Sequence, residues 1–462
     1  MKPKHILALG LLALGLGSCG ESFFEQYPSN NITEGNFYKT DDDFNQGVAA
    51  CYYKLKTQMS FHLTEIGYRG DENVLESMAV STQNRYDIDH FAETANNGIL
   101  NDIWNAWYNG IYRCNDVLDH MTGAKIANYD KYRGECLFLR SWWYFNLYRV
   151  FGVVPITRTV VTPAAAKLIP RCTEEEMYTL LTEDLAEAAR LLPPTPGPEK
   201  ARVANIAAYT LLAKVYLTFG KPAEAKTALE EAMKNTSYGL ESTTKKVFDV
   251  GNKMNREIIF ALYYNKTNDN GHGYWYSANT DVLADINNPT PTFKAIYDSE
   301  KDNRLPLISS YTKIKDNLFA MTKWYDTYDA TYTTQVGNDF PHLRYADVVL
   351  MYAEALAESG GSLGDALEWL NKTRTRAGLD ELTTDEVKSL AEFRRELAAE
   401  RGREFALEGH RWFDLVRLGL AVDYFREMGY SLDSHNLIFP IPQNQIEIVN
   451  NPSILWQNPG FN

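Results

Sequence analysis

The feature that most constrains the fold is a pair of short amphipathic helical patterns joined by a tight turn, which occurs more than once. Apolar residues recur at helical spacing over 206–219 and again over 225–233, and a Gly-Lys-Pro break separates the two stripes. Tyr345–Ser359 and Leu363–Thr373 repeat this layout around a Gly-Gly turn. Each apolar stripe needs a surface to pack against, and paired helices supply one to each other. The sequence therefore predicts a mostly α-helical protein built from packed helix pairs.

Small residues stand where the two helices of each pair would cross, which resembles a tetratricopeptide unit. Two less regular pairs are predicted upstream. One joins Tyr129–Val150 to Glu174–Leu191, and the other joins Ile99–Asp119 to the segment before it. We therefore expect a tetratricopeptide-like scaffold that carries long irregular loops.

The N-terminus has the layout of an export signal. A basic start precedes Ile6–Gly17, an apolar run without charge, and small residues stand directly before Cys19. The run is too short to span a bilayer, which takes about 20 residues. Because Leu-Gly-Ser-Cys resembles the bacterial lipobox, we predict a signal peptide over 1–18 and lipidation of Cys19. An ordinary signal peptide with an incidental cysteine is the alternative. The mature body would comprise 19–462, attached to a membrane by acyl chains.

Composition narrows the partners of this body. Hydrophobic residues make up 45% of the chain and charged residues 23%, an ordinary globular balance. The net charge of −14 argues against nucleic acid and against an anionic membrane surface as partners. The other cysteines lack C-x-x-C spacing, which argues against a zinc site. Helical patterns around two of them favour free buried thiols over disulfide bridges at Cys51, Cys114, Cys136 and Cys172.

Three long segments between the helical patterns lack a clear period: Thr64–Gly98, Tyr263–Pro291 and Tyr311–Val336. Loops of this length in a compact protein are usually functional. Sugars present flat C–H faces ringed by hydroxyl groups, which aromatic rings and planar polar groups can hold. We therefore predict a ligand-binding face built from Arg69, Asp71, Arg85, Tyr86, Trp275, Tyr276, Trp324 and Tyr325. For each aromatic residue, the alternative is that it packs its loop onto the helices.

The chain shows none of the residue spacings that mark common catalytic or cofactor sites. There is no His-Glu-x-x-His, G-x-S-x-G, Walker or dinucleotide-binding motif. A glycosidase-like pair of carboxylates stays open as an alternative, because the chain has 60 acidic residues that could meet in space. We expect a binding protein without catalytic residues, cofactor or metal.

Several residues that invite a functional interpretation fit a structural one better. The acidic run at 41–43 follows a threonine and precedes an apolar helix, which is typical of a helix cap. His410 lies in a predicted helical stretch, Ala391–Leu418, which we expect to be interrupted at Gly402 and Gly409. Charged residues beside apolar stripes are predicted to form ion pairs between helices: Arg344, Arg374, Arg401, Glu404 and Arg411. Tryptophans on helical runs are predicted to lie in the core: Trp104, Trp107, Trp142 and Trp143.

Blocks of sequence along most of the mature chain resemble the SusD/RagB family. In the second half they are Arg344–Ala355, Leu370–Leu379, Glu400–Arg417, Phe439–Pro442 and Gln457–Phe461. Upstream, Leu139–Pro155 matches the N-terminal half of the family. These motifs are mostly structural, so they indicate the family and not the ligand.

The resemblance implies an outer-membrane lipoprotein, exposed at the cell surface, with a tetratricopeptide-like scaffold and a loop-rich ligand face. It implies two parts intertwined in one globular unit, over 19–220 and 260–462. Members of the family capture nutrients, usually oligosaccharides, and pair with a SusC-like TonB-dependent barrel as its hinged lid; they are not enzymes. We expect the same of this chain. The alternatives are binding of peptides or other non-glycan nutrients, cleavage of a glycan, and a purely structural role beside the barrel.

Overall fold

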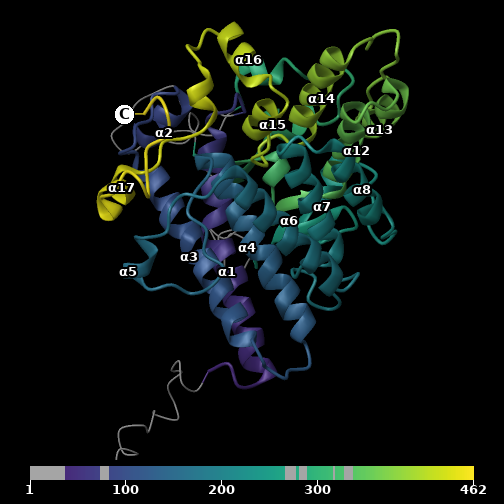
Figure 1. Cartoon of the computed structure of the whole chain (residues 1–462). Coiled ribbons are helices and arrows are strands. Elements are labelled where there is room, and N and C mark those ends of the chain that lie inside the picture. The colour runs from purple at the N-terminus through teal and green to yellow at the C-terminus, as the bar shows by residue number, and fades with distance from the viewer. Residues whose placement is uncertain are drawn as a thin grey trace, which may run out of the picture.

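The computed structural model describes residues 37–72, 83–265, 277–279, 289–315, 318–326 and 337–461. The predicted signal peptide and three of the predicted functional residues, Cys19, Trp275 and Tyr276, lie outside the described residues. Helices dominate the described part, and Figure 1 shows long N-terminal helices beside shorter C-terminal ones. The prediction of a mostly α-helical protein is confirmed.

Four long helices form an N-terminal bundle: α1 (Asp41–Gly67), α3 (Gly98–Met121), α4 (Tyr129–Phe151) and α6 (Glu174–Leu191). α4 packs against both α3 and α6, which confirms the predicted pairing of the third and fourth of these helices. The other predicted pair joined Ile99–Asp119 to the segment before it. In the structure, α3 packs mainly against α1 and to a lesser extent against the short α2 (Gln83–Asp89).

The centre of this bundle is aromatic. Four tryptophans of α3 and α4 are buried as predicted: Trp104, Trp107, Trp142 and Trp143. Gly110 lies opposite Trp143, and a Cβ atom at this glycine would overlap the indole ring. The missing side chain thus lets α3 and α4 approach closely enough to enclose the ring.

Two helix pairs continue the scaffold: α7 (Asn205–Thr218) with α8 (Pro222–Met233), and α12 (Tyr345–Glu358) with α13 (Leu363–Ala377). Each pair is closely packed, and α8 also packs against α12, so the two predicted tetratricopeptide-like units are confirmed and stand next to each other. The residues of α8 that face inward are small or apolar, Ala225, Ala228, Leu229 and Ala232. Small side chains permit this close approach between helices.

The C-terminal region comprises α14 (Leu390–Glu404), α15 (Arg411–Arg417), α16 (Ala421–Glu427) and α17 (Gln443–Val449). The predicted interruption at Gly402 is wrong, because α14 continues to Glu404. Gly402 instead makes room for a neighbour: its position for a Cβ atom lies 3.0 Å from Nη1 of Arg411. The predicted interruption at Gly409 is confirmed, since this residue lies between α14 and α15 with a φ of 75°.

Two small antiparallel sheets complete the fold. β1 (Ile258–Leu262) pairs with β5 (Phe340–Arg344), and all residues of both strands are buried. The second sheet has the order β2 (Ser277–Asn279), β4 (Leu318–Met321), β3 (Tyr311–Lys315). Our expectation of an irregular loop over the whole of Tyr311–Val336 is therefore wrong at its start, where the chain forms a hairpin.

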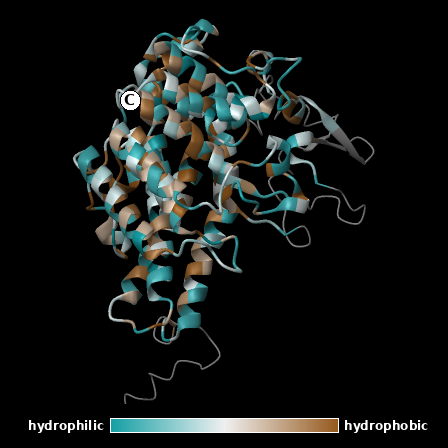
Figure 2. Ribbon diagram, turned by 90° about the vertical axis from the view of Figure 1, so that its right-hand side faces the viewer, coloured by the Kyte–Doolittle hydropathy of each residue, from teal (hydrophilic) through white to brown (hydrophobic). Residues whose placement is uncertain are grey.

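Short helical turns connect the larger elements. They are α5 (Pro163–Ala166), α9 (Thr244–Val247), η2 (Val250–Asn252), α10 (Pro291–Lys294), α11 (Leu305–Ser309), η4 (Thr322–Trp324) and η5 (Ser434–Leu437). Figure 2 shows hydrophobic and hydrophilic residues mixed along the helices in view, as helices with one buried side require. No helix of the described residues is long and apolar enough to cross a membrane.

Local predictions at the N-terminal bundle agree with the structure. The hydroxyl of Thr40 accepts a hydrogen bond from the Asp43 backbone N–H, and the Asp43 carboxylate accepts one in return from the Thr40 backbone, which makes a capping box at the start of α1. The four cysteines within the described residues are free and buried. The predictions of a helix cap and of free buried thiols are confirmed.

Candidate functional site

The described residues that flank 73–82, 280–288 and 327–336 converge on the connection between α14 and α15. We call this connection, Phe405–His410, the central turn. On the side of 73–82, the Leu407 backbone N–H donates a hydrogen bond to Glu72. On the side of 327–336, Lys323 donates to the Ala406 carbonyl and, at 2.8 Å, to Glu408. Two loops that lie far apart in sequence are thus fastened to the same turn.

A third segment joins at Asp71. This carboxylate is buried and accepts a hydrogen bond of 2.9 Å from Nε of Arg411, the first residue after the central turn. Its second oxygen accepts from the hydroxyl of Tyr424. The Thr290 hydroxyl donates to the Asp71 backbone carbonyl at 2.9 Å, so the chain returning from 280–288 begins beside the chain that leaves for 73–82.

The bases of the remaining loop segments are also closed by hydrogen bonds. The Gly337 backbone N–H donates to Asp326 at 2.9 Å, which joins the two sides of 327–336. Asp339 accepts from the Tyr264 backbone N–H at 2.9 Å and from Lys253 at 2.7 Å, which ties the start of 266–276 to the same place. These contacts bring the flanks of the three predicted loops together.

A buried network of charges supports this region. Arg344 donates to Glu257 at 2.8 Å, to Glu404 at 2.6 Å and to Glu408 at 2.8 Å. Burial opposes ionisation of Glu404, but the guanidinium groups of Arg376 and Arg344, with a third from Arg304, hold its pKa well below the usual range. The carboxylate is therefore ionised and paired at every physiological pH.

The predicted ion pairs between helices are confirmed for Arg401 and Glu404. Arg344 and Arg411 also form ion pairs, but Arg344 lies on β5 and the partner of Arg411 lies after α1. Arg401 pairs with Asp347 and Asp414, each at 2.8 Å, and Arg411 pairs with Asp71 as described. Arg374 differs, because its Nε donates to the Asp380 carbonyl at 3.0 Å. His410 stacks on Phe405 with ring centroids 4.6 Å apart, and burial lowers its pKa well below the usual value, so it is a structural, neutral histidine.

Arg69 was predicted to face a ligand, and the structure corrects this interpretation to a structural one. The side chain is 0% exposed and forms an ion pair with buried Glu93. Its guanidinium lies 3.8 Å from the ring centroid of Phe439 and 5.2 Å from that of Trp412. A planar cation of this kind packs well between aromatic faces. Asp71 is likewise bound inside the protein, so neither side chain is available to a ligand.

Arg85 and Tyr86 occupy a different position, on α2 directly after 73–82. The Arg85 side chain is 23% exposed and reaches Glu65 at 3.2 Å. Burial raises the pKa of Glu65 to about 7, although the charge of Arg85 opposes this rise. Tyr86 is half-buried and stacks on His90 with ring centroids 3.8 Å apart. Both predicted residues therefore remain accessible beside a loop base.

Trp324 and Tyr325 differ in exposure although they are adjacent in sequence. Trp324 is 1% exposed and packs against Phe248, with ring centroids 5.1 Å apart, and against Phe340. Its predicted contact with ligand is corrected to packing beneath the loops, which was the alternative for each aromatic residue. Tyr325, the next residue, is half-buried and stays a candidate. The structure does not test Trp275 and Tyr276, which lie outside the described residues.

The carboxylates nearest the loop bases do not form an open acid–base pair. Asp71 is engaged by Arg411, and Glu72 is 1% exposed, with its pKa raised to about 8 by burial and by the neighbouring charge of Asp71. Both lie inside the packing, where a substrate has no access. Among the described residues, no group of three or more His, Cys, Asp or Glu side chains could hold a metal ion.

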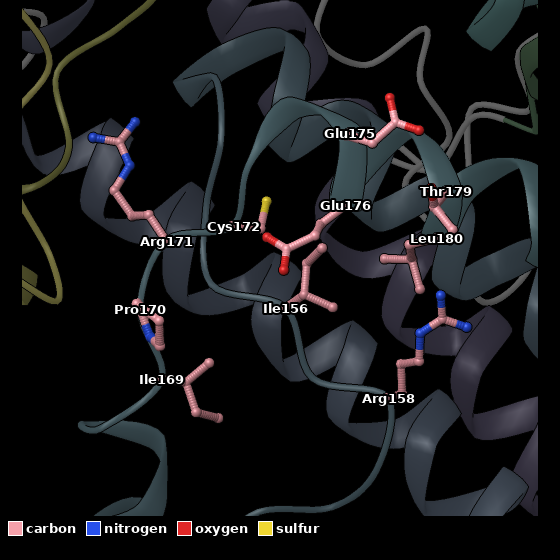
Figure 3. Close-up of a pocket in the computed structure, with 10 residues that line it drawn as sticks. All are labelled: Ile156, Arg158, Ile169, Pro170, Arg171, Cys172, Glu175, Glu176, Thr179 and Leu180. Carbon is pink, nitrogen blue, oxygen red and sulfur yellow. The ribbon is translucent and has the colours of Figure 1, made fainter.

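A cavity of about 480 Å³ lies beside the start of α6 (Figure 3), but three of its charged side chains already have partners. Figure 3 shows Arg171 and Arg158 on either side of Glu176. Arg171 donates to the Trp456 carbonyl at 2.8 Å, Arg158 pairs with Glu183 at 2.8 Å, and Glu176 caps α6. These side chains are therefore occupied in holding the segment before α6 in place.

No sequence pattern indicates which residues hold the loop bases in place. Lys323, Asp326, Asp339 and Lys253 were not among the predicted site residues. The partners of Lys323 and Lys253 lie 85 and 86 positions away, so no local spacing could have signalled them. Of the sequence features singled out, the family blocks around Arg344 and Glu404 lie closest to the residues that hold the loop bases.

Comparisons with known proteins agree across the chain. The SusD family model matches residues 302–461, and a model described as starch-binding associating with outer membrane matches residues 28–217. SusD-like protein P2 of Formosa agariphila is 25% identical in an alignment that covers 99% of this chain and 100% of that protein.

Solved structures share the fold. A SusD-like protein from Bacteroides fragilis superposes with a TM-score of 0.78 at 22% identity, covering 94% of this chain and 100% of its own. Surface glycan-binding protein A from Bacteroides thetaiotaomicron, solved in complex with laminarihexaose, gives a TM-score of 0.74 at 21% identity, covering 91% and 99%. Since two family models match the two halves and a relative aligns with almost the whole chain, the chain belongs to the SusD/RagB family.

Proposed function

We propose that this chain is a surface lipoprotein of the outer membrane that captures an oligosaccharide and delivers it to a SusC-like TonB-dependent barrel, acting as the lid of that barrel. In this role the protein binds and releases its ligand without a chemical step and needs no cofactor. The body over 19–462, with its two intertwined parts over 19–220 and 260–462, is held by the lipid on Cys19.

One observation carries the proposal: the fold matches, over nearly the whole chain, a surface glycan-binding protein solved with laminarihexaose. The description of the family model over 28–217 as starch-binding and associating with the outer membrane supports the same ligand class and location. The convergence of three loop bases on the central turn adds a structural reason, because it assembles one face from segments distant in sequence.

We place the ligand on that face. Arg85 and Tyr86 stand beside one loop base and Tyr325 beside another. Trp275 and Tyr276 belong to 266–276, whose start is tied to Asp339 through the Tyr264 backbone. Aromatic rings would lie under the apolar faces of the sugar rings, and polar side chains such as Arg85 would bind the hydroxyl groups. Neutral sugars release no counterions, so the affinity should depend little on salt.

The lipid anchor would hold the body beside the partner barrel, which would take up the bound oligosaccharide. The residues between Cys19 and the first described residue, Phe37, can span at most about 60 Å when fully extended. An anchor within this distance would keep the body close to the mouth of the barrel. Two or more acyl chains hold a protein stably on a membrane, at about 0.8 kcal/mol per buried methylene.

The test is calorimetry of the full-length protein in detergent against a panel of polysaccharides and peptides. A polysaccharide should bind, and the double variant Trp275→Ala/Tyr276→Ala should lose affinity about tenfold or more, a change of about 1.4 kcal/mol in the binding free energy, because both aromatic rings proposed to contact the sugar are removed. Trp456→Ala is the matched control, because this tryptophan is 41% exposed and stacks on Arg171 away from the loop bases.

Other outcomes discriminate the alternatives. Binding of peptides but of no polysaccharide would replace the glycan by another nutrient. Shortening of the bound glycan on incubation would contradict the assignment as a non-enzyme. If no ligand binds and uptake still depends on the chain, the protein serves the barrel as a structural partner only.

A further inference from the structure

Between α4, α7 and α15 lies a second cavity, of about 290 Å³, which is lined by three cationic side chains. They are Arg149 of α4, Lys214 of α7 and Arg417 of α15. One lining residue, His410, is the last residue of the central turn, and none of the others flanks 73–82, 280–288 or 327–336. The cavity thus borders the central turn but contains none of the predicted ligand-binding residues.

The ion pairs around this cavity leave one cation over. Lys214 pairs with Asp347 at 2.5 Å, Arg401 with Asp347 and Asp414, and Arg417 with Asp414 and Glu354. Three cations and three carboxylates thereby balance one another. Arg149 is the fourth cation, and no carboxylate of the described residues forms an ion pair with it.

Arg149 also has unused hydrogen-bonding capacity. Its Nη2 donates to the side chain of Asn146, but its Nε is buried without an acceptor, and its Nη1 makes no hydrogen bond within the described part of the chain. The guanidinium lies over the rings of Phe413, 3.9 Å from the centroid, and of Phe145, at 4.7 Å. The aromatic faces hold the cation in a fixed orientation, while Nε and Nη1 have no acceptor among the described residues.

The surroundings are short of negative charge as a whole. Burial lowers the pKa of Arg149 to about 9, and the nearest carboxylates, Asp414 and Asp347, offset this only in part. Burial also lowers the pKa of Lys214 to about 8, despite its bond to Asp347. Arg149 as a whole is half-buried, but its Nε is buried without an acceptor. Leaving a buried donor unmatched is unfavourable, so natural proteins usually satisfy it with a ligand, an ion or water.

We propose that this cavity is an oxyanion-binding site, in which Arg149 binds the carboxylate or sulfate group of a small ligand. A planar guanidinium binds two oxygens of such a group through parallel N–H donors, which makes arginine well suited to it. Lys214 and Arg417 line the same cavity together with Asp414, and their charges are balanced by their carboxylate partners, so Arg149 supplies the unbalanced positive charge. Its volume is close to the lower end of about 300–1,000 Å³ for ligand sites, so one sugar acid or a free inorganic anion fits better than a chain.

The test uses the full-length protein in detergent and compares sodium glucuronate with glucose, which has the same ring without the carboxylate. Calorimetry should show glucuronate binding and no glucose binding at this cavity. Sodium sulfate forms the second arm: binding of sulfate alone supports a free inorganic anion as the occupant, and binding of glucuronate alone supports a sugar acid. If neither anion binds the wild-type protein, the proposal is overturned.

The variant Arg149→Met keeps the stem that packs on Phe413 and removes the charge. It should lose at least tenfold in anion affinity, whereas Arg190→Met should bind as the wild type does, since the Arg190 side chain is 71% exposed and distant from the lining residues. Sulfate stabilises most proteins without binding. A melting temperature that sulfate raises equally in Arg149→Met and in the wild type would therefore count against the site.

A purely structural role for Arg149 predicts a different result. If Arg149 only packs the helices, Arg149→Met should melt well below the wild type in anion-free buffer, and anions should leave both proteins unchanged. The oxyanion site predicts that the variant melts at or above the wild type without anion, because an unmatched charge has been removed. Should the variant not fold, the wild-type comparison of glucuronate with glucose decides.

Discussion

Replacing Trp324 by alanine separates packing from ligand binding at the loop bases. The indole is 1% exposed, packs edge-on against Phe248 at 5.1 Å and against Phe340, and lies 5.3 Å from the Lys323 ammonium. Truncation of a buried tryptophan to alanine costs about 3–5 kcal/mol through lost transfer energy and the cavity that remains. Aromatic pairs add about 0.5–1.5 kcal/mol each. We expect a loss of about 4–5 kcal/mol in the free energy of unfolding.

The assay is urea unfolding followed by far-ultraviolet circular dichroism, which does not depend on tryptophan emission. Trp456→Ala is the control, and its loss should stay below about 1 kcal/mol because its ring is 41% exposed. Glycan affinity is then measured at a temperature where the variant is folded, and it should fall only a few-fold. A Trp324→Ala protein as stable as the wild type, but unable to bind glycan, would refute the placement of this ring in the core.

Three further perturbations test other features. Gly110→Ala should lower the melting temperature by several degrees, at a cost of about 1–3 kcal/mol or more, because the new methyl group overlaps the Trp143 ring; thermal unfolding measures this, and an unchanged melting temperature would contradict the close packing of α3 and α4. Glu72→Gln should gain stability relative to the wild type as the pH rises from about 5 to 8, by up to a few kcal/mol. Burial raises the Glu72 pKa from 4.5 to about 8, so the native state holds the proton longer than the unfolded state does, and wild-type stability falls with pH across this window; parallel pH-dependent stability curves would count against it. Cys19→Ser should leave folding and ligand affinity intact but move the protein out of the membrane fraction, and a variant that stays there would disprove the lipobox assignment.

The helical scaffold was predictable because its signals are local. Periodic apolar stripes, a Gly-containing turn and the capping run at 41–43 each act within a few residues, and the structure confirms α7 with α8 and α12 with α13. Gly402 misled the prediction, since a glycine inside a helix usually marks a break, whereas here it makes room for Arg411. Tertiary packing overrode the local preference at that position.

The candidate site was less predictable because its contacts are long-range. Arg69 and Asp71 looked like ligand-binding groups in a polar segment, yet the partner of Asp71 lies 340 positions away at Arg411. Trp324 lay in a segment without helical period, and nothing in its neighbours indicated that a short hairpin and η4 would turn the ring inward. Exposure of a side chain depends on the assembled fold, so residue type alone could not separate Trp324 from Tyr325.

The central turn has a consequence for how such proteins change over time. Described residues that border 73–82, 280–288 and 327–336 are held by hydrogen bonds near Phe405–His410; they are Glu72, Thr290, Asp326 and Gly337. One of these segments can therefore be exchanged or lengthened without loss of the hydrogen bonds that hold the bases of the others. A change of ligand preference then requires substitutions only within these segments, while the scaffold contacts stay the same. A foreign segment could be grafted between Asp326 and Gly337 on the same principle.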